Sequence, residues 1–571
     1  MDGPPQCFGW KKVSESAQIR TRSSNLFQME SRFFQNILGD RIRGAKTPSR
    51  LPSSPPPRAP TGAPVSASLA FRSWNVSSLD APPTEFSDPE LLYKPLLDRP
   101  NSGACFAGGG TVSASLAVGY LQAFQELGLL GKLRYVSGVS GGAWGTAPFC
   151  YLPEDYSDDQ YLGPKLLPEQ ITEEHLNAAP AGSMAYAVSH APIVLRGLAK
   201  LSYSPSVKKT FLEPFGLGDA RFFSTDEHAL ESILSRNPNL TRDDFLLLKK
   251  NRPYPIMGAV MKPAIRIGPR FNYPVDFTPL YTSVKTSEFS QGEQQQAAGE
   301  RRIETFGLNA RSARKIDGQH VEGEIPGHHL SLAEAMGSTG NAPAGGVYKL
   351  PLLNFCFPRY RFWHPLSGEY QHQNFGDGGY ADETGMLALL SRKVENIAVF
   401  VTKAFMETPP AISWFRLPCN IAHNQIAPLF GQPSVYRHFK HVFPESQWSE
   451  LVEGIRQAKA GGGPTTFQAR YHVQANEFYR IPGDWECNVK WVFNDTAKEL
   501  KNWSWAQRLP AKIREQLGGA GELYNFPWVR IFGQNLPSLI QLTPKQANLL
   551  GDLAYWRVIE QQEQYQQLLD P

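Results

Sequence analysis

A stretch of 50 residues constrains the fold most, because its pattern reads strand, helix, strand, helix. Ser102–Ala107 and Leu133–Ser137 are short apolar runs of the kind that form buried strands. Ser113–Leu130 has apolar residues at helical spacing, and Gly141–Tyr151 can form a second helix. This alternation predicts an α/β fold of three layers, α/β/α, around a central and mostly parallel sheet.

The N-terminal part differs in composition from the rest. The first 60 residues hold ten Lys and Arg against four Asp and Glu, and residues 47–64 are rich in Pro and Ser. Such a segment buries too little apolar area to offset its ordering entropy, so we expect residues 1–85 to be disordered. A basic, Ser-rich segment is also typical of organelle transit peptides, so targeting to a plastid or mitochondrion stays open.

Residues 86–571 are expected to form the globular domain. Within it, residues 153–250 hold no motif for chemistry and are interpreted as a cap insertion over the site. Residues 286–325 contain a Gln- and Gly-rich run, which predicts an inserted loop.

Composition excludes several classes of function. The formal net charge of +4 is too small to predict a nucleic-acid partner. The six cysteines form no C-x-x-C pair, so neither a zinc site nor a disulfide framework is expected, and the prediction includes no metal and no cofactor. No apolar run is long enough for a transmembrane helix, and the first residues lack the apolar core of a secretory signal. A cytoplasmic, reducing setting is therefore predicted, with oligomeric state left open.

Ser140 is the candidate nucleophile. Gly138, Ser140 and Gly142 fit the G-x-S-x-G pattern, with a predicted strand before it and a predicted helix after it. Small residues flank the serine in this pattern because the sharp strand-to-helix turn leaves no room for Cβ atoms. The helix N-terminus that follows favours developing negative charge.

A run of three glycines, Gly108, Gly109 and Gly110, follows the first predicted strand. Backbone N–H groups in such a run can converge on an anion without obstruction by side chains. Together with Gly141, these glycines are the candidate oxyanion hole of an acyl-transfer site. A nucleotide phosphate loop is the rival, but neither G-x-x-x-x-G-K-[ST] nor G-x-G-x-x-G is present here.

The serine needs a base. A His–Asp triad is one option, but the only histidine clusters, His328-His329 and His438/His441, have no companion acids that recommend them. Asp377 is the better candidate, because the glycines around it serve a tight turn that can bring its carboxylate close to another backbone segment.

These residues together resemble the patatin-like and cytosolic phospholipase A2 superfamily, in which a Ser–Asp dyad replaces the triad. In that family a glycine-rich oxyanion loop precedes the serine, and here Gly110 precedes Ser140 by 30 residues. The segment between them resembles the cytosolic phospholipase branch. Further similar segments are 252–256, 276–279, 330–344, the Asp377 turn with Asp382 and Gly385, and 525–558 with Trp556.

The resemblance implies an enzyme that hydrolyses lipid esters, of phospholipase A2 or lysophospholipase type, through an acyl-enzyme on Ser140. It implies a phospholipid substrate at a membrane surface as the partner. Two features depart from the family. Val112 stands where an Arg commonly meets the substrate phosphate, and no calcium-dependent membrane-binding module is expected before the domain. The alternatives are a lipid transacylase, a neutral-glyceride lipase and an inactive lipid-binding scaffold.

Overall fold

The computed structural model describes most of the chain from residue 68 onward. The described residues are 68–76, 88–190, 203–262, 272–286, 289–291, 294–296, 299–315, 320–324, 329–341, 358–363, 370–405, 423–433, 440–519, 521–527, 529 and 541–571. Residues 64–571 form one compact unit, and the other unit, Met1–Ala63, lies wholly outside the described residues. The expectations of disorder or targeting for that N-terminal part therefore stay predictions.

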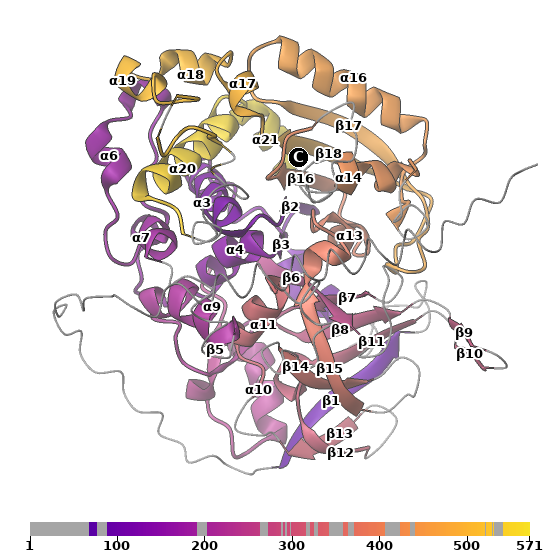
Figure 1. Cartoon of the computed structure of the whole chain (residues 1–571). Helices are drawn as coiled ribbons and strands as arrows, with labels where there is room; N and C mark the ends of the chain where they lie inside the picture. The colour runs from indigo at the N-terminus through magenta and orange to yellow at the C-terminus, as the bar shows by residue number, and fades with distance from the viewer. Residues whose placement is uncertain are drawn as a thin grey trace, which may run out of the picture. The chain divides into compact units, whose positions relative to one another are not determined.

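A 14-stranded mixed sheet runs through the centre of this unit (Figure 1). Its main path is β12-β13-β1-β11-β8-β7-β6-β3-β2-β16-β18-β17, and β14 and β15 join it through β6. The strands are β1 (Ser68–Val76), β2 (Ser102–Phe106), β3 (Tyr135–Val139), β6 (Tyr254–Lys262), β7 (Tyr273–Phe277), β8 (Tyr281–Thr286), β11 (Gly299–Glu304), β12 (Arg311–Lys315), β13 (His320–Glu324), β14 (Arg359–Trp363), β15 (Tyr370–Asp377), β16 (Asn396–Val401), β17 (Thr466–Val473) and β18 (Trp485–Phe493). Two further pairs, β4 (Phe222–Ser224) with β5 (Phe245–Leu247) and β9 (Phe289–Gln291) with β10 (Gln294–Gln296), lie outside the main sheet.

Parallel pairing is concentrated at the middle of the sheet. The five strands β6, β3, β2, β16 and β18 pair in parallel, and all the other strands of the sheet pair antiparallel. Strands β2, β3 and β16 are buried along their whole length, as expected for parallel strands with helices on both faces, whereas the outer parallel strand β18 also carries polar residues. In β16, Ala398 and Phe400 point into one core cluster, whereas Ile397 and Val399 point into the other.

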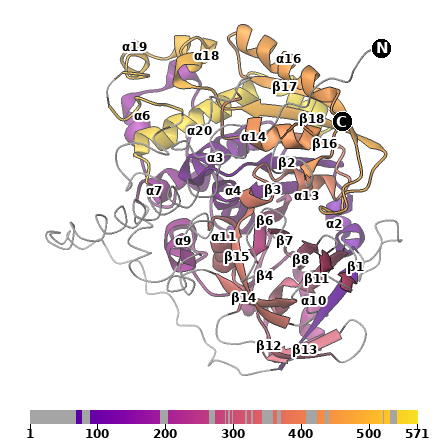
Figure 2. The same ribbon diagram turned by 45° about the vertical axis from the view of Figure 1, so that its right-hand side comes forward.

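The helices divide between the same two clusters (Figures 1 and 2). The first face carries α3 (Gly110–Glu126), α4 (Gly141–Tyr151), α5 (Asp158–Leu162), α6 (Glu173–Asn177), α7 (Met184–Ser189), α9 (Tyr203–Phe211), α10 (Glu227–Arg236), α11 (Leu332–Thr339), α17 (Ala497–Leu500), α18 (Ser504–Arg508), α19 (Ala511–Arg514), α20 (Pro544–Ile559) and α21 (Gln562–Leu569). The second face carries α2 (Lys94–Leu97), α13 (Met386–Leu390), α14 (His423–Ile426) and α16 (Gln447–Ala460). The three-layer α/β/α prediction is confirmed.

Helix α3 is held between the sheet and α20. A Cβ at Gly119 would lie 2.1 Å from the carbonyl oxygen of Gly551, so the two helix backbones touch at this point. Most of α3 is buried, which is why its sequence is apolar or small on nearly every side. This packing fixes the N-terminus of α3, where the glycine run ends.

Two segments differ from the sequence-based expectations, and the prediction for a third stays untested. Strand β1 pairs with β11 and β13, so the sheet begins before residue 86. Residues 286–325, expected to be an inserted loop, contain strands β9 to β13, because antiparallel partners supply the order that the composition does not reveal. Residues 153–250 pack into the same core cluster as α3 and α4, and their covering of a cleft stays a prediction.

Candidate active site

Ser140 lies in a strained turn between β3 and α4. Its φ is 52° and its ψ is −123°, a conformation that costs a side-chain-bearing residue roughly 1–3 kcal/mol. The glycines on either side leave the space that the turn needs. A Cβ at Gly138 would lie 2.7 Å from the backbone of Ala143, and a Cβ at Gly142 would lie 2.0 Å from the carbonyl oxygen of Phe106.

The register of β6 brings Ser140 and Asp377 together. Strand β3 ends with Val139 opposite Gly258, and β15, running the other way, ends with Asp377 opposite Ala259. The carboxyl ends of the two strands therefore meet against consecutive residues of β6. The Ser140 hydroxyl is in hydrogen-bonding contact with the Asp377 carboxylate, and both side chains are nearly buried, with 7% of each residue exposed.

Thr339, the last residue of α11, holds the strained turn in place. Its hydroxyl accepts the N–H of Ser140 at 3.0 Å and donates to the carbonyl oxygen of Gly258. The Thr339 side chain thereby connects Ser140 to Gly258 of β6. The next residue of β6, Ala259, lies opposite Asp377. Thr339 was not singled out in the sequence, although it lies in the similar segment 330–344.

The glycine run lies directly against the serine turn. A Cβ at Gly141 would lie 1.9 Å from the carbonyl oxygen of Gly110, so only glycine allows this approach. Gly109 and Gly110 have positive φ values of 153° and 61°. The N–H groups of Gly109, Gly110 and Gly141 donate to no other group in the described part of the chain. These three N–H groups are free to bind an anion beside Ser140.

Gly108 lies at the site, but its N–H is not available as the oxyanion donor that was predicted. Its N–H donates to the carbonyl oxygen of Glu383 at 3.0 Å and is therefore occupied. A Cβ at Gly108 would lie 3.4 Å from the Cβ of Ser140, so this glycine provides space at the site instead of a donor.

The Asp377 carboxyl group has an unusual acidity. Burial and then the negative charge of Glu383 raise its pKa from 3.8 to about 7. The N–H of Gly379, which donates to Asp377 Oδ1 at 2.8 Å, the Ser140 hydroxyl and the charge of Lys403 act in the opposite direction. An ordinary Asp is a feeble base, whereas a carboxylate with a pKa near neutral can accept a proton from a hydroxyl.

Glu383 and Lys403 complete the polar surroundings of the dyad. Lys403 Nζ lies 2.7 Å from Glu383 Oε1, and their side chains are only 12% and 15% exposed. Neither residue was predicted from the sequence. Glu383 follows Asp377 by six residues and Lys403 follows strand β16, but neither belongs to a pattern that predicts a role.

The predicted absence of a catalytic histidine can be compared with the described residues. No described histidine is bonded to Ser140 or Asp377, and His441 Nε2 donates to the carbonyl oxygen of Phe443 instead. His328 and His438 lie outside the described residues. Within the described chain, no group of three or more His, Cys, Asp or Glu side chains is arranged to hold a metal ion.

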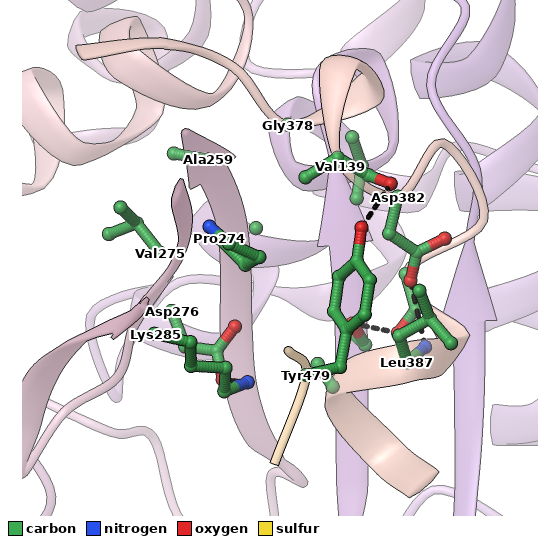
Figure 3. A pocket seen from close by; sticks show the side chains of 15 residues that line it. Val139, Ala259, Pro274, Val275, Asp276, Lys285, Gly378, Asp382, Leu387 and Tyr479 are labelled. Carbon is green, nitrogen blue, oxygen red and sulfur yellow. Dashed lines mark hydrogen bonds and ion pairs between the residues drawn. The ribbon is translucent and has the colours of Figure 1, made fainter. Parts of the chain in front are cut away.

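A small cavity lies beneath the serine turn, on the side of the second core cluster (Figure 3). Val139, Ala259 and Gly378 line one part of it, and Asp382 and Tyr479 line another. Its volume of about 20 Å³ is room for about one water molecule. Ligand pockets typically measure about 300–1,000 Å³, so this cavity does not hold a lipid chain.

Val112 is buried in α3 and belongs to the first core cluster. The position at which the resemblance leads us to expect an Arg is therefore part of the core in this chain.

None of the described helices combines the length and apolar character needed to cross a membrane.

No family model and no curated protein matches the chain. Among solved structures, the chain is similar to human GIVD cytosolic phospholipase A2, at 15% identity and a TM-score of 0.45. It is also similar to that protein in complex with methyl gamma-linolenyl fluorophosphonate, at 13% identity and a TM-score of 0.41, and with the same inhibitor and terbium chloride, at 16% and 0.40. Each match covers 84% of this chain and 62% of the other, so the chain spans less than two thirds of those proteins. At these values the likeness concerns the fold alone.

Proposed function

We propose that the protein is a serine hydrolase that cleaves carboxylic esters of lipids through a Ser140–Asp377 dyad. One observation carries the proposal. The carboxyl ends of β3 and β15 meet, so that the Ser140 hydroxyl is hydrogen-bonded to the buried Asp377 carboxylate, which has a pKa of about 7. A strained serine with no visible role in stability is typical of a nucleophile.

In the proposed reaction, Asp377 takes the proton of Ser140 as Ser140 Oγ attacks the ester carbonyl carbon. The N–H groups of Gly109, Gly110 and Gly141 stabilise the oxyanion, at roughly 2.7–4 kcal/mol for each donor. The alcohol leaves with the proton from Asp377, and the acyl group stays on Ser140. Water then attacks the acyl-enzyme with Asp377 again as base, which releases the fatty acid.

The lipid part of the proposal has separate support. It comes from the ordered set of segments that resemble the patatin-like and cytosolic phospholipase A2 superfamily. A phospholipase A2 or lysophospholipase activity at a membrane surface is the finer form of the proposal.

The described cysteines Cys105, Cys150 and Cys487 are unpaired and buried, which supports a reducing, cytoplasmic setting.

The test measures fatty acid release from phosphatidylcholine, lysophosphatidylcholine and triacylglycerol by the purified full chain. Ser140→Ala and Asp377→Asn are expected to lower the rate by roughly 10⁴- to 10⁶-fold with unchanged circular dichroism. Ser137→Ala is the matched control, because Ser137 lies on β3, the strand that leads to Ser140, and its hydroxyl donates to the carbonyl of Gly385 at 2.7 Å instead of contacting the dyad. Retained turnover in either dyad variant contradicts the mechanism, and acylated product with an added lipid alcohol identifies a transacylase.

A further inference from the structure

Glu383 contacts both halves of the candidate site. Its carbonyl oxygen accepts the N–H of Gly108, which begins the glycine run. Its carboxylate lies so close to two glycines that a Cβ at Gly108 would be 2.9 Å from Oε1 and a Cβ at Gly379 would be 2.2 Å from Oε2. Glu383 therefore fills the space between the glycine run and the turn that follows Asp377.

Lys403 approaches the same place from the neighbouring strand. It pairs with Glu383 Oε1 at 2.7 Å, and Thr402 before it packs on Gly109, where a Cβ would lie 2.7 Å from the threonine Cγ2. A largely buried ion pair gains little stability, because the desolvation of both charges offsets their attraction. The position of this pair beside the dyad suggests that it serves the site.

We propose that the Glu383–Lys403 ion pair is a positioning element of the dyad, which holds the glycine run against the Asp377 turn and sets the pH range in which Asp377 activates Ser140. This inference rests on the proposed function. Neither residue touches the reacting atoms in it; both act through Asp377.

The charges around Asp377 give the pair opposite effects. The negative charge of Glu383 raises the pKa of Asp377, and the positive charge of Lys403 lowers it. Lys262 on β6 also faces Asp377; burial lowers its pKa to about 8, and the charge of Asp377 opposes that shift.

A second group of charges acts on the pair itself. Lys440 is buried, which lowers its pKa, and it interacts with Asp382, Glu383 and Lys403. When Glu383 is replaced, Lys403 loses its partner and its positive charge stays beside Asp377. When Lys403 is replaced, Lys440 still compensates part of the negative charge of Glu383.

The experiment measures kcat/KM for ester hydrolysis from pH 5 to 9 in the full chain. Glu383→Gln is expected to move the acid limb to lower pH by roughly one unit, because Asp377 then loses its proton more easily. Lys403→Met is expected to move the limb to higher pH by a smaller amount, because the charge of Lys403 acts on Asp377 more weakly than that of Glu383, and the double variant is expected to lie between Glu383→Gln and wild type. A displacement of one unit changes the rate about tenfold at a pH below the limb.

Lys249→Met is the matched control. Lys249 pairs with Asp158 at 2.9 Å, and its side chain is also 12% exposed. Its N–H donates to the carbonyl of Cys150, at the far end of α4 from Ser140. This variant should leave the acid limb in place, and Lys403→Gln replaces Lys403→Met if the latter does not fold.

Opposite displacements in the two single variants support the inference. The inference is overturned if the acid limbs of the two pH profiles do not move from the wild-type position, or if both move in the same direction. The proposed function fails separately, when the wild type itself releases no fatty acid. In that case the pH dependence of Ser140 labelling by a fluorophosphonate reports the same limb, and a wild type that neither hydrolyses nor labels overturns both.

Discussion

Replacing Asp377 by Asn is expected to stabilise the folded protein above neutral pH while it abolishes hydrolysis. Asn has the shape of Asp, so its side-chain oxygen can still accept the N–H of Gly379. It lacks the charge that burial and Glu383 make unfavourable in the folded chain. Function at this position therefore opposes stability.

The pKa of Asp377 gives the size and the sign of the effect. It is raised from 3.8 to about 7 in the folded chain, and each unit corresponds to about 1.4 kcal/mol. Because the folded state keeps its proton up to a higher pH than the unfolded state, the wild type loses stability as the pH rises from about 4 to about 7. Asn does not titrate, so its advantage grows over that window towards a ceiling of about 4 kcal/mol and is constant above it.

Melting temperatures of the two proteins at pH 4.5, 6 and 8 measure this difference. Asp276→Asn is the control, because the charges of Lys285 and Arg392 outweigh burial and hold the pKa of Asp276 well below its usual range. Its loss of stability should be the same at pH 6 and 8, since both lie above its titration in either state. A difference between Asp377→Asn and wild type that does not change from pH 4.5 to 8 would refute the assignment of a proton-holding carboxyl group at this position.

Three further outcomes are expected. Hydrolysis should rise with pH through about 7, the pKa of Asp377, and a limb near 4 in initial rates would contradict its role as the base. Gly141→Ala should abolish the labelling of Ser140 by a fluorophosphonate and lower the melting temperature, because its Cβ would lie 1.9 Å from Gly110 O. The control Gly131→Ala places its Cβ in open space and should change neither property. Thr339→Val leaves the buried N–H of Ser140 without its acceptor, which should cost about 1–3 kcal/mol of stability and slow Ser140 labelling. Thr339→Ser keeps the hydroxyl and should behave as wild type. Equal losses of stability and labelling rate in both variants would refute the role of the hydroxyl.

The parallel core of the sheet could be predicted from sequence because its signals are local. Strand β3, the turn at Ser140 and helix α4 follow one another directly, with apolar runs and glycines at the positions that the turn needs. Strand β1 and the strands of residues 286–325 could not be predicted in this way. Their order comes from antiparallel partners along the sheet. Strand β1 has apolar residues but follows a Pro- and Ser-rich segment, and residues 286–325 are rich in Gln, Gly and charged residues.

The candidate site divides in the same way. Ser140 and the glycine run lie within motifs, and Asp377 has glycines beside it that mark a tight turn. Thr339, Glu383 and Lys403 reach the site only through the register of β6 and the pairing of β16 with β2. No spacing in one sequence contains that information, and for the same reason the occupied N–H of Gly108 could not be foreseen.

Covalent labelling tests the central claim most directly. The full chain is treated with an alkyl fluorophosphonate at pH 8, where the Asp377 carboxyl group with a pKa of about 7 is mostly ionised, and the adduct is located by peptide mass spectrometry. The account predicts one adduct, on Ser140, that is absent from Ser140→Ala and strongly slowed in Asp377→Asn. A folded wild-type protein whose Ser140 stays unmodified, or that reacts equally fast without the Asp377 carboxylate, would contradict it.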